Sequence, residues 1–379
     1  MVVLRATAVR GTSMSLLNLW PTIIFWSDCS ESARSVTRTR SFSEPMDSTC
    51  SSKVAQYSPR RTPPARSSDK NNKIGVFIGK LNYLCRRGHA FWAEAMEMPT
   101  STIVFSGLSP HPPILVPEIG KDEIQKCIKS RLGLQEFSKK LRDSKPEILV
   151  LITPHGPVFH DAISIYTVPS YHGDFGQFGC PEVAIEAKGY PELALQIHDC
   201  ARAKGIPIVN LSQKSFAQYG IPSSLDHATM VPLYYFNEAG LHVPLVLISM
   251  GLLPFRQLFD FGSCIRSAIE NQKSRVAVVA SGDLSHRLIP GSVAGYDPIG
   301  KEFDQRMIDL LKNQDAEGIM KLDQDFIERA GECGFRPILM MLGATHHLKN
   351  QSEVISYEGP FGVGYGVVAY SPARNGAET

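Results

Sequence analysis

The 379-residue chain lacks any run of about 18 uninterrupted apolar residues, which is the length that a membrane-spanning helix requires. Its most apolar stretch, residues 13–26, is interrupted by Pro21. Hydrophobic residues make up 43% of the chain and charged residues 20%, which is the ordinary composition of a soluble globular protein. We therefore expect no membrane span and no membrane partner.

Paired cysteines are also missing. The eight cysteines are scattered, and no two of them have Cys-x-x-Cys spacing, so the sequence does not indicate a zinc ribbon. A disulfide framework is not expected either, because a chain of this length can bury a large hydrophobic core without covalent cross-links. This use of cysteine is typical of a reducing compartment, and we predict a cytoplasmic protein.

Positive charge is scarce in most of the chain, although the formal net charge is +2. Residues 1–95 hold 14 Lys and Arg against 6 Asp and Glu, which gives a net charge of +8. The remaining 284 residues hold 25 against 31, which gives a net charge of −6. A nucleic-acid-binding surface needs a basic patch, so we expect no nucleic-acid partner for the main part of the chain.

The N-terminal segment, residues 1–97, has the composition of a disordered extension. Residues 28–73 are rich in Ser, Thr, Arg and Pro, and such a segment buries too little apolar surface to offset its ordering entropy. Three explanations stay open: an organelle-targeting presequence, a regulatory tail, or upstream sequence before a true start at Met96 or Met98. We favour the last, because a regular pattern begins abruptly at Thr102, and we predict one folded domain over residues 98–379.

From Thr102 onwards, short apolar strands alternate with amphipathic helices. Strands are expected at residues 103–107, 147–153, 163–168, 208–211, 244–250, 275–281, 353–357 and 363–369. Helices are expected at residues 122–144, 190–204, 227–239, 258–272, 298–311, 316–330 and 336–347. This alternation is typical of a single α/β domain with a mainly parallel central sheet and helices on both faces. The last helix is strongly apolar, so it serves either the core or an interface of a homo-oligomer.

Three histidines follow three of these strands. His111 lies in a Ser-Pro-His-Pro-Pro loop, His155 in a Pro-His-Gly loop, and His286 at the end of Ser-Gly-Asp-Leu-Ser-His. Ligands of open α/β sheets gather at the carboxyl ends of the strands, so the three side chains are expected in one crevice. A lone histidine in such a loop more often bonds its neighbours and caps a turn, but three at three strand ends favour a metal or catalytic site. Asp283 or Ser285 is placed to fix the tautomer of His286, which is a natural acid–base group near neutral pH.

His227 begins a predicted helix directly after Asp226. The helix dipole favours a neutral imidazole at this position, and a neutral imidazole suits a proton-transfer partner. A purely structural pair of His227 with Asp226 explains the same pattern equally well, so both interpretations stay open.

Two histidines need a third ligand to hold a metal. A ferrous site takes two histidines and one carboxylate on one face, which makes Fe2+ the first choice here. The candidates for the third ligand are Glu332 and Cys333, in Ala-Gly-Glu-Cys-Gly-Phe-Arg-Pro, and Glu358. Glu358 is equally well explained as a structural acceptor for Arg336. A Cys333 thiolate would give a softer site that also takes copper or Zn2+.

Taken together, these motifs resemble the superfamily of class III extradiol ring-cleavage dioxygenases. The resemblance runs from about residue 102 to residue 370, and the order of the motifs makes it specific. The motifs lie at residues 109–113, 154–156, 173–179, 224–227 and 281–286. The chain is most similar to the Memo-like branch, also called the AmmeMemoRadiSam group, through residues 109–114, 331–337 and 357–365.

The resemblance implies a role for each of four histidines. His111 and His155 match the two metal-binding histidines, His286 matches the active-site base, and His227 matches an acid–base residue. It also implies the reaction, which is Fe2+-dependent opening of a catechol-type or related small aromatic ring by O2.

The chain departs from the dioxygenase pattern at the third ligand. True dioxygenases have a glutamate in the apolar helix after the Leu-Ser-His motif, where this chain has Arg336 and Pro337. Memo-like proteins have a cysteine that matches Cys333, which implies a metal-binding redox or adaptor protein without ring cleavage as an alternative. A third alternative is an accessory protein of a radical-SAM system, which would need a separate AMMECR1-type partner.

Overall fold

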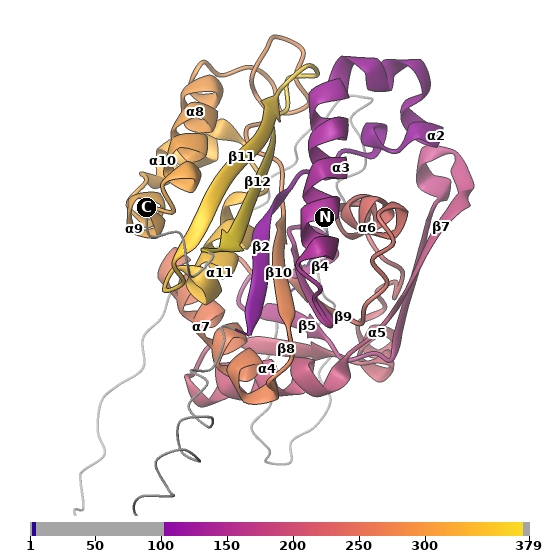
Figure 1. Cartoon of the computed structure of the whole chain (residues 1–379), viewed down its shortest axis with the longest axis vertical. Helices are drawn as coiled ribbons and strands as arrows, with labels where there is room; N and C mark the ends of the chain where they lie inside the picture. Colours follow the sequence, from indigo (N-terminus) through magenta and orange to yellow (C-terminus); the bar gives the residue numbers. More distant parts are fainter. Residues whose placement is uncertain (1, 5–101, 374–379) are drawn as a thin grey trace, which may run out of the picture. The chain divides into compact units, whose positions relative to one another are not determined.

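The computed structural model describes residues 2–4 and 102–373, and its central feature is an eight-stranded mixed sheet. Four neighbouring parallel strands form the middle of this sheet (Figure 1). In spatial order they are β2 (Ile103–Ser109), β10 (Val276–Ser281), β3 (Ile148–Thr153) and β9 (Leu245–Ser249). Every residue of these strands is buried, as their nearly continuous apolar sequences predict for strands covered on both faces.

The margins of the sheet contain antiparallel pairs. On one side β12 (Tyr365–Pro372) pairs with β2, and β11 (Asn350–Glu358) pairs with β12. On the other side β5 (Ile163–Tyr166) runs antiparallel to β9 and pairs in parallel with β8 (Ile208–Leu211). The predicted parallel arrangement therefore holds in the middle of the sheet. It does not hold for β11 and β12, because a short turn joins them and a short turn permits only antiparallel pairing.

Helices cover both faces of the sheet, as predicted (Figure 1). One face carries α4 (Pro191–Ala203), α7 (Phe255–Gln272), α8 (Ile299–Lys312) and α11 (Phe335–Thr345). The other face carries α3 (Ile128–Asp143) and α6 (His227–Glu238). Successive strand residues serve opposite faces, so Val150 of β3 belongs to the first core and Leu151 to the second.

The strongly apolar helix predicted near the end of the chain is α11, and it belongs to the core. All of its residues from Pro337 to Thr345 are buried, and it packs against α7 and β10. A helix that is apolar on every side is stable only when it is covered on every side. Of the two interpretations left open for this segment, the structure therefore favours the core.

Two predicted helices are each divided in the structure. The segment 316–330 forms two helices, α9 (Ala316–Met320) and α10 (Gln324–Ala330), because the Asp323 carboxylate caps the second by accepting from the Phe326 N–H at 3.1 Å. The segment predicted as one helix from residue 122 starts as a 3-10 helix, η2 (Lys121–Cys127), before α3 begins.

The sequence pattern missed a hairpin between the predicted strands. It consists of β6 (Ser170–Phe175) and β7 (Cys180–Lys188), with the 3-10 turn η3 (Gly176–Phe178) at its tip. Glycines interrupt the alternation of apolar and polar side chains there, which hides the strand signal. The remaining elements are β1 (Val2–Leu4), which pairs with β4 (Pro157–Phe159), η1 (Pro113–Leu115), α2 (Pro117–Gly120) and α5 (Gln213–Tyr219).

The predicted extension, residues 1–97, and the domain boundary at residue 98 lie outside the described residues, apart from β1. The division of the chain at that point stays a prediction. Among the residues that the structure does describe, no helix combines the length and apolar character needed to cross a membrane.

Candidate metal centre

The candidate site lies where three adjacent strands of the sheet end. The strand order places β10 between β2 and β3, and Ser281 at the end of β10 is in register with Ser109 at the end of β2. His111 follows β2, His155 follows β3, and Asp283 follows β10. Because these strands are parallel, all three side chains emerge at the same edge of the sheet.

The imidazoles of His111, His155 and His227 form one group. The ring centroids of His111 and His155 are 5.0 Å apart, and those of His155 and His227 are 4.8 Å apart. One ring nitrogen from each of the three residues lies within 4.8 Å of the other two. His227 reaches this group because it is the first residue of α6, whose start lies beside the end of β3. Three imidazole nitrogens at this spacing are a suitable donor set for a transition metal.

A second group shares His111 and adds Asp283 and Cys333. The His111 Nε2 atom lies 3.6 Å from the Cys333 Sγ and 3.7 Å from the Asp283 Oδ2. The other carboxylate oxygen of Asp283 accepts a hydrogen bond from the His111 backbone N–H at 3.0 Å. The Asp283 backbone N–H in turn donates to the Cys333 sulfur at 3.4 Å. His111 therefore presents the same ring nitrogen to a carboxylate and a thiol.

The tautomer of His111 is fixed by Ser281. The Ser281 hydroxyl lies 3.0 Å from the His111 Nδ1, and it donates its only proton to the Ala228 carbonyl at 2.6 Å. The hydroxyl oxygen can therefore only accept from the imidazole, which places the ring proton on Nδ1. The lone pair of the neutral ring is then on Nε2, the atom that faces Asp283 and Cys333.

A hydrogen-bonded chain joins the loop of His155 to the start of α6. The His155 backbone N–H donates to the Thr153 Oγ1 at 3.2 Å, and that hydroxyl donates to Asp226 at 3.1 Å. The same Asp226 oxygen accepts from the Thr229 N–H at 3.0 Å, which caps α6. Asp226 therefore links the loop of His155 to the start of α6 and fixes the position of His155 relative to His227. Asp226 itself is in neither donor group.

Cys333 reaches the site through a close backbone approach. A Cβ on Gly282 would lie 2.3 Å from the Gly334 Cα, so any larger residue at 282 would push the two segments apart. The Gly334 N–H donates to the Asp283 carbonyl at 2.9 Å at the same place. The glycine at 282 thus allows the start of α11 to bring Cys333 against Asp283.

The site is poor in positive charge. Burial lowers the pKa of His111 and of His155 well below the usual range, and the neighbouring histidines lower both further. Burial also lowers the pKa of His286 to about 4. All three rings are therefore neutral at pH 7, which is the form that binds a metal or accepts a proton.

Burial has the opposite effect on the acidic groups. It raises the pKa of the Asp283 carboxyl to about 7. It also raises the pKa of the Cys333 thiol well above the ordinary value, and the charges of Asp283 and Glu332 add to that shift. A bound cation would reverse both effects, because a metal ion deprotonates a coordinating thiol and stabilises a carboxylate. The neutral histidines bring no positive charge to Asp283 and Cys333, so the cluster is suited to bind a metal cation.

His286 lies beside the two groups rather than in them. Its proximity is among the causes that lower the pKa of His111 and of His155, and it follows β10 at the same edge of the sheet. Its Nε2 atom is buried and has no hydrogen-bond partner in the described part of the chain. A buried nitrogen of this kind is available to a ligand.

A family of known proteins matches the part of the chain that builds this geometry. The family model described as the catalytic LigB subunit of aromatic ring-opening dioxygenase matches residues 107–368. The match covers more than half of the chain and contains all the strand ends that build the candidate site. The chain belongs to the LigB family.

Three known proteins are similar to this LigB-family chain. "Protein CA_C1420" of Clostridium acetobutylicum is 36% identical over 268 residues, which are 71% of this chain and 57% of that protein. The 3,4-dihydroxyphenylacetate 2,3-dioxygenase of Escherichia coli is 29% identical over 242 residues, 59% of this chain and 83% of the relative. The 2-aminophenol 1,6-dioxygenase beta subunit of Pseudomonas sp is 24% identical over 308 residues, 74% of this chain and 97% of the relative. The chain thus spans just over half the length of the first relative.

The structure brings four of the residues singled out from the sequence into the two groups of this LigB-family site. They are His111, His155, His227 and Cys333. Glu332 lies outside both groups, and its carboxylate accepts instead from the Phe335 N–H at the start of α11, at 2.5 Å.

The third candidate from the sequence, Glu358, also lies outside both groups. Its carboxylate accepts from the Ser130 N–H at 2.6 Å, so its hydrogen bond is to α3 and not to Arg336. With Glu332 and Glu358 engaged elsewhere, Cys333 is the candidate third ligand that the geometry supports best among those named from the sequence.

Sequence reasoning missed three residues of the site. Asp283 was considered only as a partner of His286, whereas it contacts His111. Ser281 was treated as the last residue of a strand, and its hydroxyl role depends on a contact with His111, 170 residues away. Phe178, at the tip of the unpredicted hairpin, places its ring edge-on to His227 with the centroids 5.7 Å apart. All three residues lie within motifs named from the sequence, at residues 281–286 and 173–179, but no role was assigned there to Ser281 or Phe178 because their contacts with His111 and His227 join distant segments.

Proposed function

We propose that this chain is a metal-dependent extradiol dioxygenase that opens a catechol-type or related small aromatic ring with O2. The observation that carries the proposal is the group formed by His111, His155 and His227 at the ends of adjacent strands. These residues and His286 are the ones to which the family resemblance assigns metal binding and proton transfer. Two relatives that are named as dioxygenases of small aromatic compounds support the same class of reaction.

The donor atoms fit a divalent metal, with Fe2+ as the first choice. His111 and His155 are neutral, and the contact with Ser281 leaves the His111 Nε2 free to bind. The free oxygen of Asp283, 3.7 Å from that nitrogen, would complete the two-histidine, one-carboxylate arrangement that is typical of non-haem Fe2+. Cys333 is the softer alternative on the same side. Ferrous iron held there would supply the one-electron chemistry that lets a catecholate react with O2.

The remaining histidines are proposed to move protons. His286 has a neutral ring and a buried nitrogen without a partner in the described residues, so it is suited to accept the proton of a substrate hydroxyl. A negatively charged substrate oxygen beside it would raise the pKa of the ring from about 4 towards the working range. His227 begins α6 next to the metal-binding histidines and is proposed as the second proton-transfer group.

The test is oxygen uptake by protein that has been purified without air and loaded with Fe2+. The substrates are catechol, 3,4-dihydroxyphenylacetate and 2-aminophenol, and ring opening is followed by the yellow colour of its products. We expect turnover of at least one of them. His286→Ala should lower kcat by about 100-fold or more, which is the usual effect of removing a general base, without releasing iron. The exposed His160→Ala is the matched control and should be neutral. Iron-loaded protein that turns over none of the substrates would contradict the proposal.

A second function is favoured by one observation, the position of Cys333 in the group with His111 and Asp283. In this alternative the chain is a Memo-like protein that binds copper or iron for a redox or adaptor role, without ring cleavage. Thiolate ligands favour soft metals, so Cu(I) or Zn2+ would then bind more tightly than Fe2+.

Cys333→Ser separates the two functions. If the thiol is a ligand of a soft metal, the variant should lose copper and lose the thermal stability that copper confers. If the site is a ferrous one completed by Asp283, the variant should keep iron and turnover. Asp283→Asn is the reciprocal variant, and it should release iron while it keeps copper.

Assembly with a second polypeptide also belongs to this proposal. One relative is named as a beta subunit, and the first relative extends well beyond the region that it shares with this chain. We propose that the chain works as a homo-oligomer or with a separate subunit, for which an AMMECR1-type or radical-SAM partner is the candidate. The mass of the purified full-length chain in solution tests the first case, and co-purification from the native source tests the second.

A further inference from the structure

Asp304 is a buried carboxylate on α8 that neither the metal centre nor the proton-transfer steps use. Its side chain is fully buried, with 0% exposure. One oxygen accepts from the Ser285 backbone N–H at 2.7 Å, and the other accepts from the Tyr357 hydroxyl at 2.7 Å. Both partners are neutral, so no cation offsets the cost of burying this acid. An acid kept in such a place needs a reason other than stability.

The Ser285 peptide that Asp304 holds directly precedes His286. The backbone on either side of that peptide is also fixed. The Leu284 N–H donates to the Gly364 carbonyl and the Gly364 N–H donates to the Ser285 carbonyl, both at 2.8 Å. A Cβ on Gly364 would lie 1.9 Å from the Asp304 carboxylate, so only glycine leaves room for the acid here. Asp304 and Gly364 therefore support this segment from one side.

The side chain of Ser285 fixes the segment from the other side. Its hydroxyl donates to the Ala330 carbonyl at 2.8 Å and accepts from the Arg287 N–H at 3.0 Å. The His286 N–H donates to the same carbonyl at 3.2 Å. By contrast, the His286 Nε2 has no partner in the described residues. The backbone anchors are thus the visible constraints on where this imidazole lies.

We propose that Asp304 is a positioning residue for His286, and that Tyr357 holds the Asp304 carboxylate in place. Asp304 fixes the Ser285 peptide, and the peptide sets the position from which the His286 ring reaches the substrate. The inference rests on the proposed function, because it matters for catalysis only if His286 acts on a substrate.

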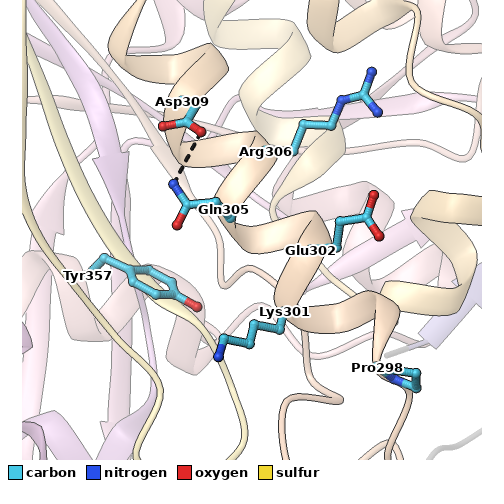
Figure 2. A pocket seen from close by; sticks show the side chains of 7 residues that line it. All are labelled: Pro298, Lys301, Glu302, Gln305, Arg306, Asp309 and Tyr357. Atoms are coloured by element: carbon cyan, nitrogen blue, oxygen red, sulfur yellow. Dashed lines mark hydrogen bonds between the residues drawn. The ribbon is translucent and has the colours of Figure 1, made fainter.

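Tyr357 makes the proposal testable without damage to the core. It belongs to β11 and lines an open pocket of about 570 Å³ together with side chains of α8 (Figure 2). Lys301, Gln305 and Asp309 are among those side chains, and Figure 2 shows the Tyr357 ring beside them. Tyr357→Phe removes one hydroxyl and keeps the ring that borders this pocket. The variant deletes the hydrogen bond to Asp304 and leaves that buried carboxylate oxygen without its donor.

The experiment compares Tyr357→Phe, Asp304→Asn and Asp304→Ala in the full-length, iron-loaded protein. Asn keeps an oxygen that can accept from the Ser285 N–H, so it should restore function, whereas Ala cannot. A displacement of about 1 Å at a catalytic group can lower a rate by about 100-fold. We therefore expect kcat to fall about fivefold in Tyr357→Phe, about 50-fold in Asp304→Ala and less than about threefold in Asp304→Asn. The KM and the bound iron should stay at wild-type values in all three.

Tyr234→Phe is the matched control, because it deletes another hydrogen bond from a tyrosine to a carboxylate, here that of Glu118. It should leave kcat unchanged. The second measurement is hydrogen exchange of the peptide that contains the Ser285 amide. That amide should be protected in the wild type and in Asp304→Asn, and it should exchange faster in Asp304→Ala.

The outcomes separate the two proposals. Wild-type turnover with unchanged kcat in both Tyr357→Phe and Asp304→Ala would overturn the positioning role and leave the dioxygenase proposal standing. If the wild type turns over no substrate, the dioxygenase proposal fails and the exchange data decide the rest. Unchanged protection of the Ser285 amide in Asp304→Ala would then overturn the positioning role as well. A loss of protection would support the structural link from Asp304 to the segment of His286.

Discussion

The Ser281 hydroxyl accepts the Nδ1 proton of His111 at a distance of 3.0 Å. The hydroxyl can only accept from the imidazole, because it donates its own proton to the Ala228 carbonyl. Ser281, at the end of β10, thereby orients His111, the candidate ligand that follows the neighbouring strand β2. The hydrogen-bond partners of metal-binding histidines commonly fix the tautomer in this way, and their loss typically weakens metal binding by about 10- to 100-fold.

Ser281→Ala should therefore weaken the binding of Fe2+ by about tenfold or more, because nothing then holds the Nδ1 proton. The affinity can be measured by competition with a chelator that changes colour on binding iron. Ser109→Ala is the matched control. Ser109 is equally buried and pairs with Ser281 in the sheet, but its hydroxyl contacts the Pro110 carbonyl and not an imidazole. Equal affinities for the two variants would contradict the role of Ser281.

Asp226→Ala should lower both stability and metal affinity. The loss of a helix cap costs about 1–2 kcal/mol of the free energy of unfolding. The same side chain also holds Thr153, which accepts from the His155 N–H, so His155 and His227 should lose their fixed relation. Urea unfolding measures the first effect, and chelator competition measures the second.

The control for Asp226 is Asp323→Ala, because Asp323 caps α10 with the same geometry. Both variants should lose the stability of a helix cap, and Asp226→Ala should lose more because Asp226 also accepts from the hydroxyls of Thr153 and Thr229. Only Asp226→Ala should lose iron. Iron affinity at the wild-type level in Asp226→Ala would show that the link from Thr153 to α6 does not position the site.

Local sequence signals were enough to predict that His111 and His155 lie together at one edge of the sheet. His111 and His155 follow apolar strands and stand between Pro and Gly residues, and a strand end in a parallel sheet is a known place for ligands. The middle of the sheet followed from the same signals, because buried parallel strands have continuous apolar sequences.

The rest of the site depends on contacts between distant segments. Cys333 was named from the sequence, but its position against Asp283 depends on the close approach of Gly334 to Gly282. The sequence alone also could not decide between Cys333 and Glu332 as third ligand. The two side chains point in different directions at the start of α11, and only Cys333 faces His111. The antiparallel margins of the sheet were hidden for a related reason, since strand order is set by pairing across the fold and not by the pattern within a strand.

Asp304→Asn should change how the stability of the metal-free protein depends on pH. Burial raises the folded pKa of Asp304 to about 7, and the nearby Glu332 charge raises it too, while hydrogen bonds from Ser285 and Tyr357 act in the opposite direction. The unfolded value is about 3.9. Between these values the folded state binds more protons than the unfolded state. The contribution of Asp304 to the free energy of unfolding is therefore complete below pH 4 and is lost as the pH rises through 7. An asparagine at this position cannot ionise, so the variant does not lose stability in this way.

The stability of Asp304→Asn relative to the wild type should therefore increase between pH 4 and pH 8, by up to roughly 4 kcal/mol. Urea midpoints across this range measure the difference. Asp309→Asn, the same substitution on the exposed face of the same helix, is the matched control. A constant difference for Asp304→Asn would show that Asp304 is not the buried, raised acid that the structure indicates.

Phe178→Ala should weaken substrate binding more than it slows the chemical step. The Phe178 ring stands edge-on to His227 at the tip of the hairpin formed by β6 and β7, so it is placed to contact an aromatic ring bound beside the histidines. Aromatic contacts of this kind contribute about 0.5–1.5 kcal/mol, which corresponds to an increase in KM of about two- to tenfold. Bound iron should not change, because Phe178 offers no donor atom.

The exposed neighbour Gln177→Ala is the control and should leave KM at the wild-type value. If Phe178→Ala instead released iron at an unchanged KM, the ring would serve to hold His227 in place and not to form a wall of the substrate site.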